Sequence, residues 1–274
     1  MLGVHPPLEE PAMPTVDSYA PGTPSFVDLG SPDPAASVEF YGGLFGWTSF
    51  APAPPELTGG YQMFQQDGRT VAGLGPQQNP GPPYWTSYVT VADVDATVKE
   101  AEAAGGTVLA PAMDVMTAGR MAVLADTEGA AFAVWQAGDS IGAELVNDPN
   151  SFCWNELMCR DLPAAKAFYA AVFGWDAETN GEPGNQYTEF SLDGKVLAGC
   201  MVMDGPQFPA EVPTYWGIYF AVADVDATAA RCAELGGGVH VPPTDIPPGR
   251  FSLLVDPQGA MFSVIRMNPE HELG

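Results

Sequence analysis

Histidine and cysteine are the side chains that most often bind metals or act as nucleophiles, and this chain of 274 residues contains few of them. Two of the three histidines lie near the chain ends and the third lies in a glycine- and proline-rich stretch: His5, His271 and His240. The four cysteines form no CxxC pair and all fall in the second half: Cys153, Cys159, Cys200 and Cys232. We therefore expect exposed or structural histidines and buried thiols in a reducing cytoplasm. GxGxxG, P-loop, GxSxG and HExxH motifs are also absent, so nucleotide, acyl-transfer and zinc-peptidase functions have no motif support.

The charge of the chain excludes several classes of partner. It has 34 acidic and 9 basic residues, which give a net charge of −25. Nucleic-acid binding needs clustered cations, and an anionic membrane surface would repel this chain. No apolar run is long enough for a membrane helix, and the first residues lack the basic start and apolar core of a secretory signal. We predict a soluble cytoplasmic protein whose electric field favours cationic or neutral small molecules.

Four sequence blocks occur twice in the same order. VADVDAT stands at 91–97 and again at 222–228, and FYGGLFGW at 40–47 returns as FYAAVFGW at 168–175. DTEGAAFAV at 126–134 returns as DPQGAMFSV at 256–264, and a Gly-Arg pair recurs at 119–120 and 249–250. This pattern indicates a tandem duplication. The predicted domains are 22–137 and 150–267, joined by a linker at 138–149, with tails at 1–21 and 268–274.

The elements that must position any functional residue can be read within each copy. Aspartates in N-cap positions begin four helices, at Asp33, Asp93, Asp161 and Asp224, and glycines end them. A short strand precedes each helix, as at 25–29 and 86–92, and further strands follow it, the last of the first copy at 130–136. Asp67-Gly68 favours a tight hairpin turn between two of these strands. The chain therefore contains four strand–helix–strands units.

These motifs resemble those of the vicinal oxygen chelate superfamily, which includes glyoxalases, bleomycin-resistance proteins and extradiol dioxygenases. The resemblance rests on the helix from Asp33 to Trp47 with its counterpart from Asp161 to Trp175, on the VADVDA helix starts, and on the Gly-Arg hairpins before each final strand. Within this superfamily the sequence is most similar to the actinobacterial two-domain members that are often labelled hydroxylases. The resemblance implies an α+β fold of tandem glyoxalase-like domains. Four βαβββ modules would form cup-shaped, curved mixed sheets with flanking helices.

The positions that correspond to the metal ligands of the family carry unsuitable side chains. Counting from the helix caps and the loop aspartates, these positions are Phe26, Thr86 and Ala133 in the first copy and Trp154, Gly217 and Ser263 in the second. Phenylalanine, tryptophan, alanine and glycine side chains offer no lone pair to a first-row metal. The resemblance therefore implies the cup without the metal, and we expect neither a metal nor another cofactor.

Strand side chains alternate between faces, so the same comparison implies which residues line the cups. The predicted ligand-binding residues are Phe26, Asp28, Tyr88 and Trp135 in the first copy, and Trp154, Glu156, Met158, Tyr219 and Ser263 in the second. Such cups are aromatic with one carboxylate each, which suits large flat organic molecules. Two alternatives stay open. The rings could fill cups that have closed, and Asp28 and Glu156 could pair with Arg120 and Arg250 instead of facing a ligand.

Two classes of function fit these features. The first is a binding or sequestration protein of the bleomycin-resistance type, which would hold an aromatic, neutral or cationic natural product and contribute to antibiotic resistance or secondary metabolism. The second is a metal-independent enzyme of aromatic polyketide metabolism, in which Asp28 or Glu156 acts as a general base. A glyoxalase- or hydroxylase-like enzyme is a further alternative. Because one chain carries both copies, we expect a monomer or a weak homodimer.

Overall fold

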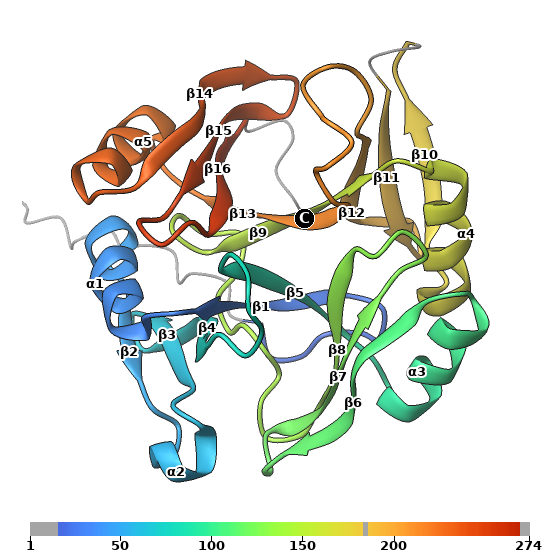
Figure 1. The fold of residues 1–274 in the computed structure, drawn as a ribbon, viewed down its shortest axis with the longest axis horizontal. Helices are drawn as coiled ribbons and strands as arrows, with labels where there is room; N and C mark the ends of the chain where they lie inside the picture. The colour runs from blue at the N-terminus through green and yellow to red at the C-terminus, as the bar shows by residue number, and fades with distance from the viewer. Residues whose placement is uncertain (1–15, 183–185, 269–274) are drawn as a thin grey trace, which may run out of the picture.

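The computed structural model describes residues 16–182 and 186–268, and it contains two eight-stranded sheets of identical topology (Figure 1). The first sheet has the order β2-β3-β4-β1-β5-β8-β7-β6, with β1 (Pro24–Ser31), β2 (Thr48–Phe50), β3 (Gln62–Gln66), β4 (Arg69–Pro76), β5 (Tyr84–Thr90), β6 (Thr107–Val115), β7 (Gly119–Ala125) and β8 (Ala131–Ala137). The second has the order β10-β11-β12-β9-β13-β16-β15-β14, with β9 (Phe152–Cys159), β10 (Asp176–Asn180), β11 (Tyr187–Leu192), β12 (Lys195–Val202), β13 (Tyr215–Ala221), β14 (Gly238–Ile246), β15 (Gly249–Val255) and β16 (Met261–Met267). The predicted α+β fold, with two tandem copies of one mixed-sheet topology, is confirmed.

Each module follows the predicted βαβββ order, and its helix begins at the predicted aspartate. The helices are α1 (Pro34–Phe45), α3 (Val94–Ala103), α4 (Leu162–Phe173) and α5 (Val225–Glu234), with a short additional α2 (Pro55–Thr58) in the first module. The side chains of Asp33, Asp93, Asp161 and Asp224 each accept a hydrogen bond from the backbone N–H three residues later, at 3.0–3.1 Å. These bonds satisfy N–H groups that have no partner within the helix.

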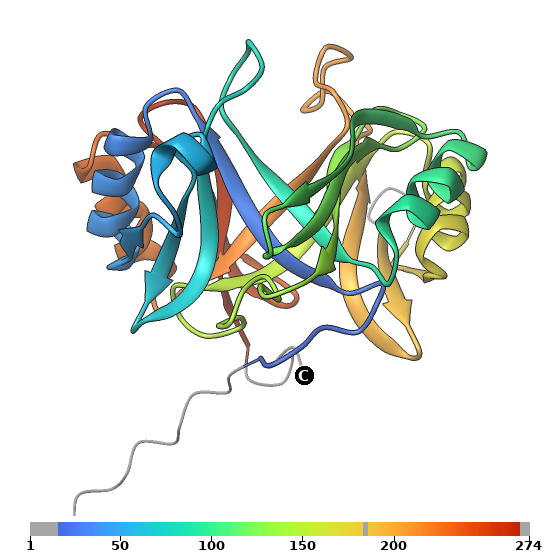
Figure 2. The same cartoon turned by 90° about the horizontal axis from the view of Figure 1, so that it is seen from below.

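Two modules combine within each half of the chain. The first strands of paired modules are antiparallel neighbours, β1 with β5 and β9 with β13, while β1–β4, β5–β8, β9–β12 and β13–β16 are parallel pairs. Each sheet curves around its central strands, and the two concave faces point to opposite sides of the molecule (Figure 1). We call these concave faces the first cup (β1–β8) and the second cup (β9–β16). The loops 77–83 and 203–214 project from one end of the molecule, in teal and orange (Figure 2).

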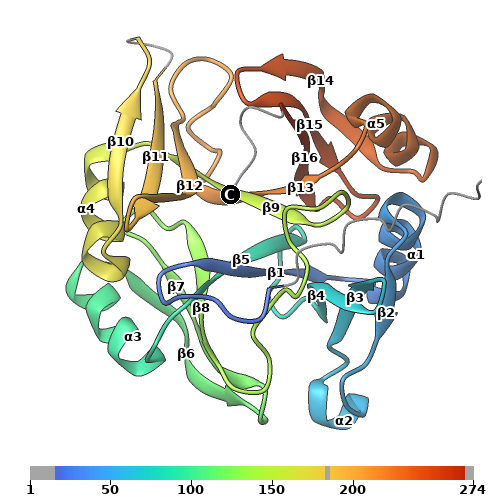
Figure 3. The same cartoon turned by 180° about the vertical axis from the view of Figure 1, so that it is seen from behind.

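The convex faces and the helices form two large cores, and each core contains residues from both halves of the chain. One joins β1, β3, β4 and α1 to β13, β15, β16 and α5, and the other joins β5, β7, β8 and α3 to β9, β11, β12 and α4. Figure 3 shows the central strands β1 and β5 lying beside β9 and β13. The sequence had left open whether the first module pairs with the second or the fourth. The first module shares a sheet with the second and a core with the fourth.

Buried tyrosines connect the two halves inside these cores. The Tyr41 hydroxyl of α1 donates to Asp256 Oδ2 at 3.2 Å, and the Tyr169 hydroxyl of α4 donates to Asp126 Oδ2 at 3.0 Å. Each tyrosine oxygen also accepts from a tryptophan N–H, at 3.2 Å from Trp85 and 2.8 Å from Trp216. The repeated FY and Asp-x-x-Gly-Ala motifs therefore meet each other across the two halves.

Some predictions concern the ends of the chain. The tail residues 1–15 and 269–274, and with them His5 and His271, lie outside the described residues. His240 on β14 is exposed, in agreement with the prediction of an exposed or structural histidine. No helix in the described part of the chain is long and apolar enough to cross a membrane.

Candidate functional site

The floor of the first cup holds a carboxylate between two tyrosines. Asp28 on β1 accepts hydrogen bonds at Oδ2 from the Tyr88 hydroxyl of β5 at 2.8 Å and from the Tyr61 hydroxyl before β3 at 3.0 Å. The Phe26 ring lies edge-on to Tyr88 with ring centroids 5.7 Å apart. Phe26, Tyr88, Trp135 and Ala133 form one apolar cluster on this face, and the Trp135 N–H donates to the Ser140 carbonyl of the linker at 2.9 Å. The four residues predicted for this cup therefore lie together.

The second cup repeats this arrangement with a longer carboxylate and a larger ring. Glu156 on β9 accepts from the Tyr219 hydroxyl of β13 at 2.8 Å, and the Trp154 N–H donates to the Tyr187 hydroxyl at 3.2 Å. Tyr219, Ile265 and Cys153 form an apolar cluster that Trp154 packs against. Tyr219 and Trp154 are direct cross-strand partners, and so are Glu156 and Gly217. Trp154 is half-buried, whereas Glu156 is buried.

Met158 and Ser263, the remaining predicted residues, lie at different places in the second cup. Ser263 on β16 is the cross-strand partner of Tyr219 and is buried beside it. Met158 is buried near the end of β9, opposite Tyr215. Alternation along β9 and β16 places both side chains on the concave face.

Two glycines explain why the tyrosines reach the carboxylates. A Cβ on Gly73 of β4 would overlap the Tyr61 hydroxyl, and a Cβ on Gly199 of β12 would overlap the Tyr187 hydroxyl. The missing side chains therefore leave room for the phenol groups over the strand backbone. Sequence reasoning missed Tyr61 and Tyr187. The sequence nevertheless shows that the two tyrosines are counterparts, because each precedes a repeated phenylalanine by three residues and a repeated Ala-Gly pair by eleven.

Burial controls the protonation of both carboxyl groups. Removal from water raises the pKa of Asp28, against hydrogen bonds from Tyr88, Tyr61 and Thr86 that lower it. Burial likewise raises the pKa of Glu156, against hydrogen bonds from Tyr219 and Tyr187. Burial, followed by the neighbouring carboxylate, also raises the pKa of Tyr88 and of Tyr219, so these phenols stay protonated as donors. Each cup thus offers a carboxyl group with an upward-shifted pKa beside an aromatic ring.

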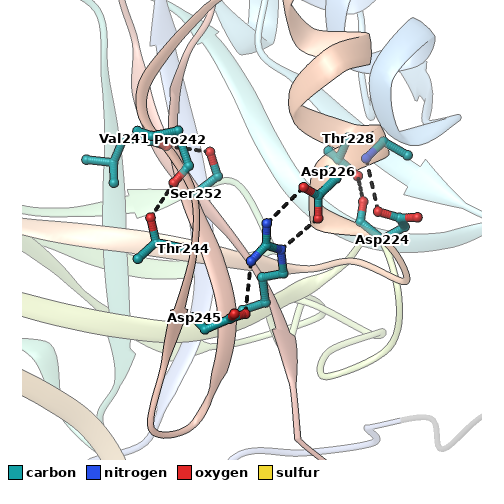
Figure 4. A network of polar contacts seen from close by, with 10 residues as sticks. Asp224, Asp226, Thr228, Val241, Pro242, Thr244, Asp245 and Ser252 are labelled. Atoms are coloured by element: carbon teal, nitrogen blue, oxygen red, sulfur yellow. Dashed lines mark hydrogen bonds and ion pairs between the residues drawn. The ribbon is translucent and has the colours of Figure 1, made fainter.

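The predicted alternative of arginine partners for these carboxylates is wrong. Arg250 instead binds Asp226 through Nε at 2.7 Å and Asp245 through Nη1 at 2.9 Å. Figure 4 labels these two aspartates, Asp226 in the first turn of α5 and Asp245 on β14. Arg120 makes the equivalent contacts with Asp95 and Asp114. The Gly-Arg motif therefore links a hairpin to the first turn of a helix in both halves. A charged guanidinium remains well hydrated at these partly exposed positions, whereas Glu156 on the floor of the second cup is buried.

The residues present do not fit the metal that the fold accommodates in other proteins. Phe26 and Trp154 occupy the first-strand positions, and the single carboxylate of each floor already accepts tyrosine hydrogen bonds. Within the described residues no group of three or more His, Cys, Asp or Glu side chains could hold a metal ion. A hydroxyl and one hydrogen-bonded carboxylate form a poor donor set for a first-row metal.

Comparisons with known proteins cover both halves of the chain. The model of the Glyoxalase/Bleomycin resistance protein/Dioxygenase superfamily matches residues 151–264, and that of the Glyoxalase-like domain matches residues 26–135. CFP32 of Mycobacterium bovis, which is named as a candidate glyoxylase, is 42% identical over 94% of this chain and 100% of its own length. The anthracycline biosynthesis protein DnrV of Streptomyces peucetius is 42% identical over 91% of this chain and 94% of its own length.

Solved structures agree in fold. The Mn(II)-bound glyoxalase from Novosphingobium aromaticivorans has a TM-score of 0.63 at 17% identity, covering 92% of this chain and 83% of its own. The 2,3-dioxygenase LapB from Pseudomonas sp. KL28 has a TM-score of 0.64 at 13% identity, covering 91% of this chain and 95% of its own. At these identities the likeness concerns the fold alone.

Proposed function

Because the chain belongs to the glyoxalase/bleomycin resistance protein/dioxygenase superfamily, we propose that it binds flat aromatic small molecules in its two cups. The observation that carries the proposal is the duplicated floor, in which an aromatic ring stands beside one carboxyl group held by tyrosine hydroxyls. A ring offers a stacking surface, and the carboxyl group and phenols offer donors and acceptors to the edge of the ligand. This combination orients a planar molecule that carries polar substituents.

The names of relatives and the charge of the chain support the same ligand class. Two Streptomyces relatives are named as anthracycline biosynthesis proteins, and anthracyclines are polycyclic aromatic compounds. The net charge of −25 disfavours anionic ligands and favours neutral or cationic ones. We therefore propose a role in the handling of aromatic natural products, by sequestration or during their biosynthesis.

Proton transfer is a second candidate function, because Glu156 is buried with a raised pKa. A carboxyl group whose pKa is moved upward can exchange a proton with a phenol or an enol of a bound polyketide. The Tyr219 hydroxyl, 2.8 Å from Glu156, would hold the carboxylate in place. In this case incubation in D₂O followed by mass spectrometry would reveal turnover, as deuterium bound to carbon in the compound.

Calorimetry with a panel of polycyclic aromatic compounds tests binding. Trp154→Ala should weaken binding in the second cup by at least about thirtyfold, which corresponds to ~2 kcal/mol for a well-packed aromatic anchor. Phe26→Ala should do the same in the first cup. Val239→Ala is a matched control, because Val239 is exposed and pairs with Leu254 of the convex core, away from the second cup. Wild-type affinity in both cup variants would show that the rings merely fill the floor.

A further inference from the structure

The two cups differ along one row of cross-strand partners. In the first cup Phe50 on β2 pairs with Met63 on β3, Met63 with Gly73, and Gly73 with Asp28. In the second cup the equivalent row contains Glu178 on β10, Glu189 on β11, Gly199 on β12 and Glu156 on β9. An aromatic ring and a thioether in one cup are thus replaced by two glutamates in the other.

Neighbouring contacts show that this row faces the cups. Met63 packs against the cluster of Phe26 and Tyr88 on the floor of the first cup. In the second cup Tyr187, two residues before Glu189 on the same strand, reaches the Trp154 N–H at 3.2 Å. Residues two apart on a strand share a face, and cross-strand partners do as well. Glu189 therefore points into the second cup. The next residue, Phe190, points to the opposite face and lies in the convex core.

The basic side chains in the described part of the protein do not neutralise the glutamates of this row. Within the described residues no ion pair involves Glu178, Glu189 or Glu156, although Glu156 is only 8% exposed. Lys166 lies nearby but donates to Thr179, whose side chain points to the opposite face from Glu178. Glu178 and Glu189 are direct partners, and like charges at such positions repel. A bound cation would relieve this repulsion.

The spacing of the carboxylates favours an organic cation over a metal ion. Glu189 and Glu156 are separated by the strand of Gly199, and adjacent strands lie about 4.8 Å apart. The described residues bring no three such groups into a metal-binding cluster. The Tyr187 hydroxyl covers Gly199 between them, so an amine carried on a ring would lie above this phenol, toward the carboxylates on either side, and the ring would stack on the half-buried Trp154.

We propose that the second cup selects aromatic ligands that carry an organic cation and that the first cup selects neutral ones. Glu189 and its counterpart Met63 are the residues that determine this difference. The proposal rests on the proposed binding function and extends it to the ligand class of each cup. Methionine adapts to irregular apolar ligands and is easily desolvated, whereas a carboxylate must lose water unless the ligand supplies a positive charge.

The test uses two planar three-ring probes, 9-aminoacridine, which is a cation at neutral pH, and acridone, which is neutral. Phe26→Ala serves as the background so that calorimetry reports the second cup. In that background Glu189→Gln should weaken 9-aminoacridine about fivefold, as expected for a partly exposed charge pair, and change acridone less than about twofold. The loss should shrink at high salt, because screening weakens partly exposed charge pairs.

The reverse change is made in the first cup, with Trp154→Ala as the background. Met63→Glu should strengthen 9-aminoacridine relative to acridone. Phe50→Glu at a 40% exposed position provides a second variant that does not bury a new charge. Urea unfolding verifies that each variant is folded.

The outcomes separate the two proposals. If Trp154→Ala abolishes binding in the second cup but Glu189→Gln leaves the preference between the probes unchanged, the selectivity is refuted and the binding function stands. If neither probe binds, or if neither Trp154→Ala nor Phe26→Ala changes binding, the binding function is refuted and the selectivity with it. A fivefold loss confined to the cation supports both.

Discussion

The hydrogen bonds of Tyr169 should make a large contribution to the stability of the whole chain. Its hydroxyl donates to Asp126 Oδ2 at 3.0 Å and accepts from Trp216 Nε1 at 2.8 Å, and all three side chains are buried. Tyr169→Phe removes only the oxygen. The ring that packs among Phe173, Trp175 and Phe190 is kept.

The size of the effect follows from what remains unpaired. The buried Trp216 N–H loses its acceptor, which costs about 1–3 kcal/mol, and Asp126 loses a charge-assisted hydrogen bond of about 1.5–3 kcal/mol. Asp126 keeps hydrogen bonds from the backbone N–H groups of Glu128 and Ala130, and the phenol no longer has to be desolvated. We expect a net loss of about 2–4 kcal/mol in the free energy of unfolding.

Urea unfolding followed by tryptophan fluorescence measures this loss. Tyr41→Phe is the matched variant in the other core and should cost less, because its two hydrogen bonds are 3.2 Å long. Tyr84→Phe, at a 41% exposed position, should change stability by less than about 0.5 kcal/mol. Because each core contains both halves of the chain, wild type should unfold in one transition. If Tyr169→Phe and Tyr84→Phe had the same free energy of unfolding, the stabilising role of the Tyr169 hydrogen bonds would be refuted.

Two further predictions concern the cup floors. Since burial raises the pKa of Asp28 and of Glu156, the folded state binds more protons than the unfolded state above about pH 4, so stability should fall as pH rises through the raised values. In the double variant Asp28→Asn/Glu156→Gln, urea unfolding between pH 4 and 8 should show a shallower fall, and an unchanged slope would contradict the shifts. Gly199→Ala should cost about 1–3 kcal/mol because the new Cβ displaces Tyr187. Gly217→Ala in the same cup, where the nearest atoms are 3.6 Å from a new Cβ, should cost much less, and equal costs in thermal unfolding would contradict this account.

Local sequence features were sufficient to predict the elements and their faces. The aspartate caps, the glycine stops and the Asp67-Gly68 turn depend on interactions within a few residues, and the structure shows all of them. The alternation along β1 and β9 likewise placed Phe26, Asp28, Trp154 and Glu156 on one face. The duplicated blocks identified the four modules because both copies retain the same local signals.

The partners of the predicted site residues required the tertiary structure. Asp28 binds Tyr61, which lies 33 residues away and reaches it over Gly73, and no local periodicity indicates such a neighbour. Arg120 and Arg250 occupy matching positions in the two copies, and so do Asp28 and Glu156. For this reason the sequence suggested that the arginines pair with these carboxylates, which is wrong. The helix starts at Asp95 and Asp226 lie closer to these arginines in the fold.

The sequence by itself determined which segments become strands and helices, which side chains share a face, and that the first strand of each cup carries a carboxylate and a large ring. Only the tertiary structure decided how the halves combine, because Tyr41 and Asp256, 215 residues apart, meet solely when the convex faces pack together. It also decided that Glu178, Glu189 and Glu156 align in one row, which depends on the register of three separate strand pairs. Periodicity reports the face of a side chain, whereas its neighbours are set by strand order, register and packing between distant segments.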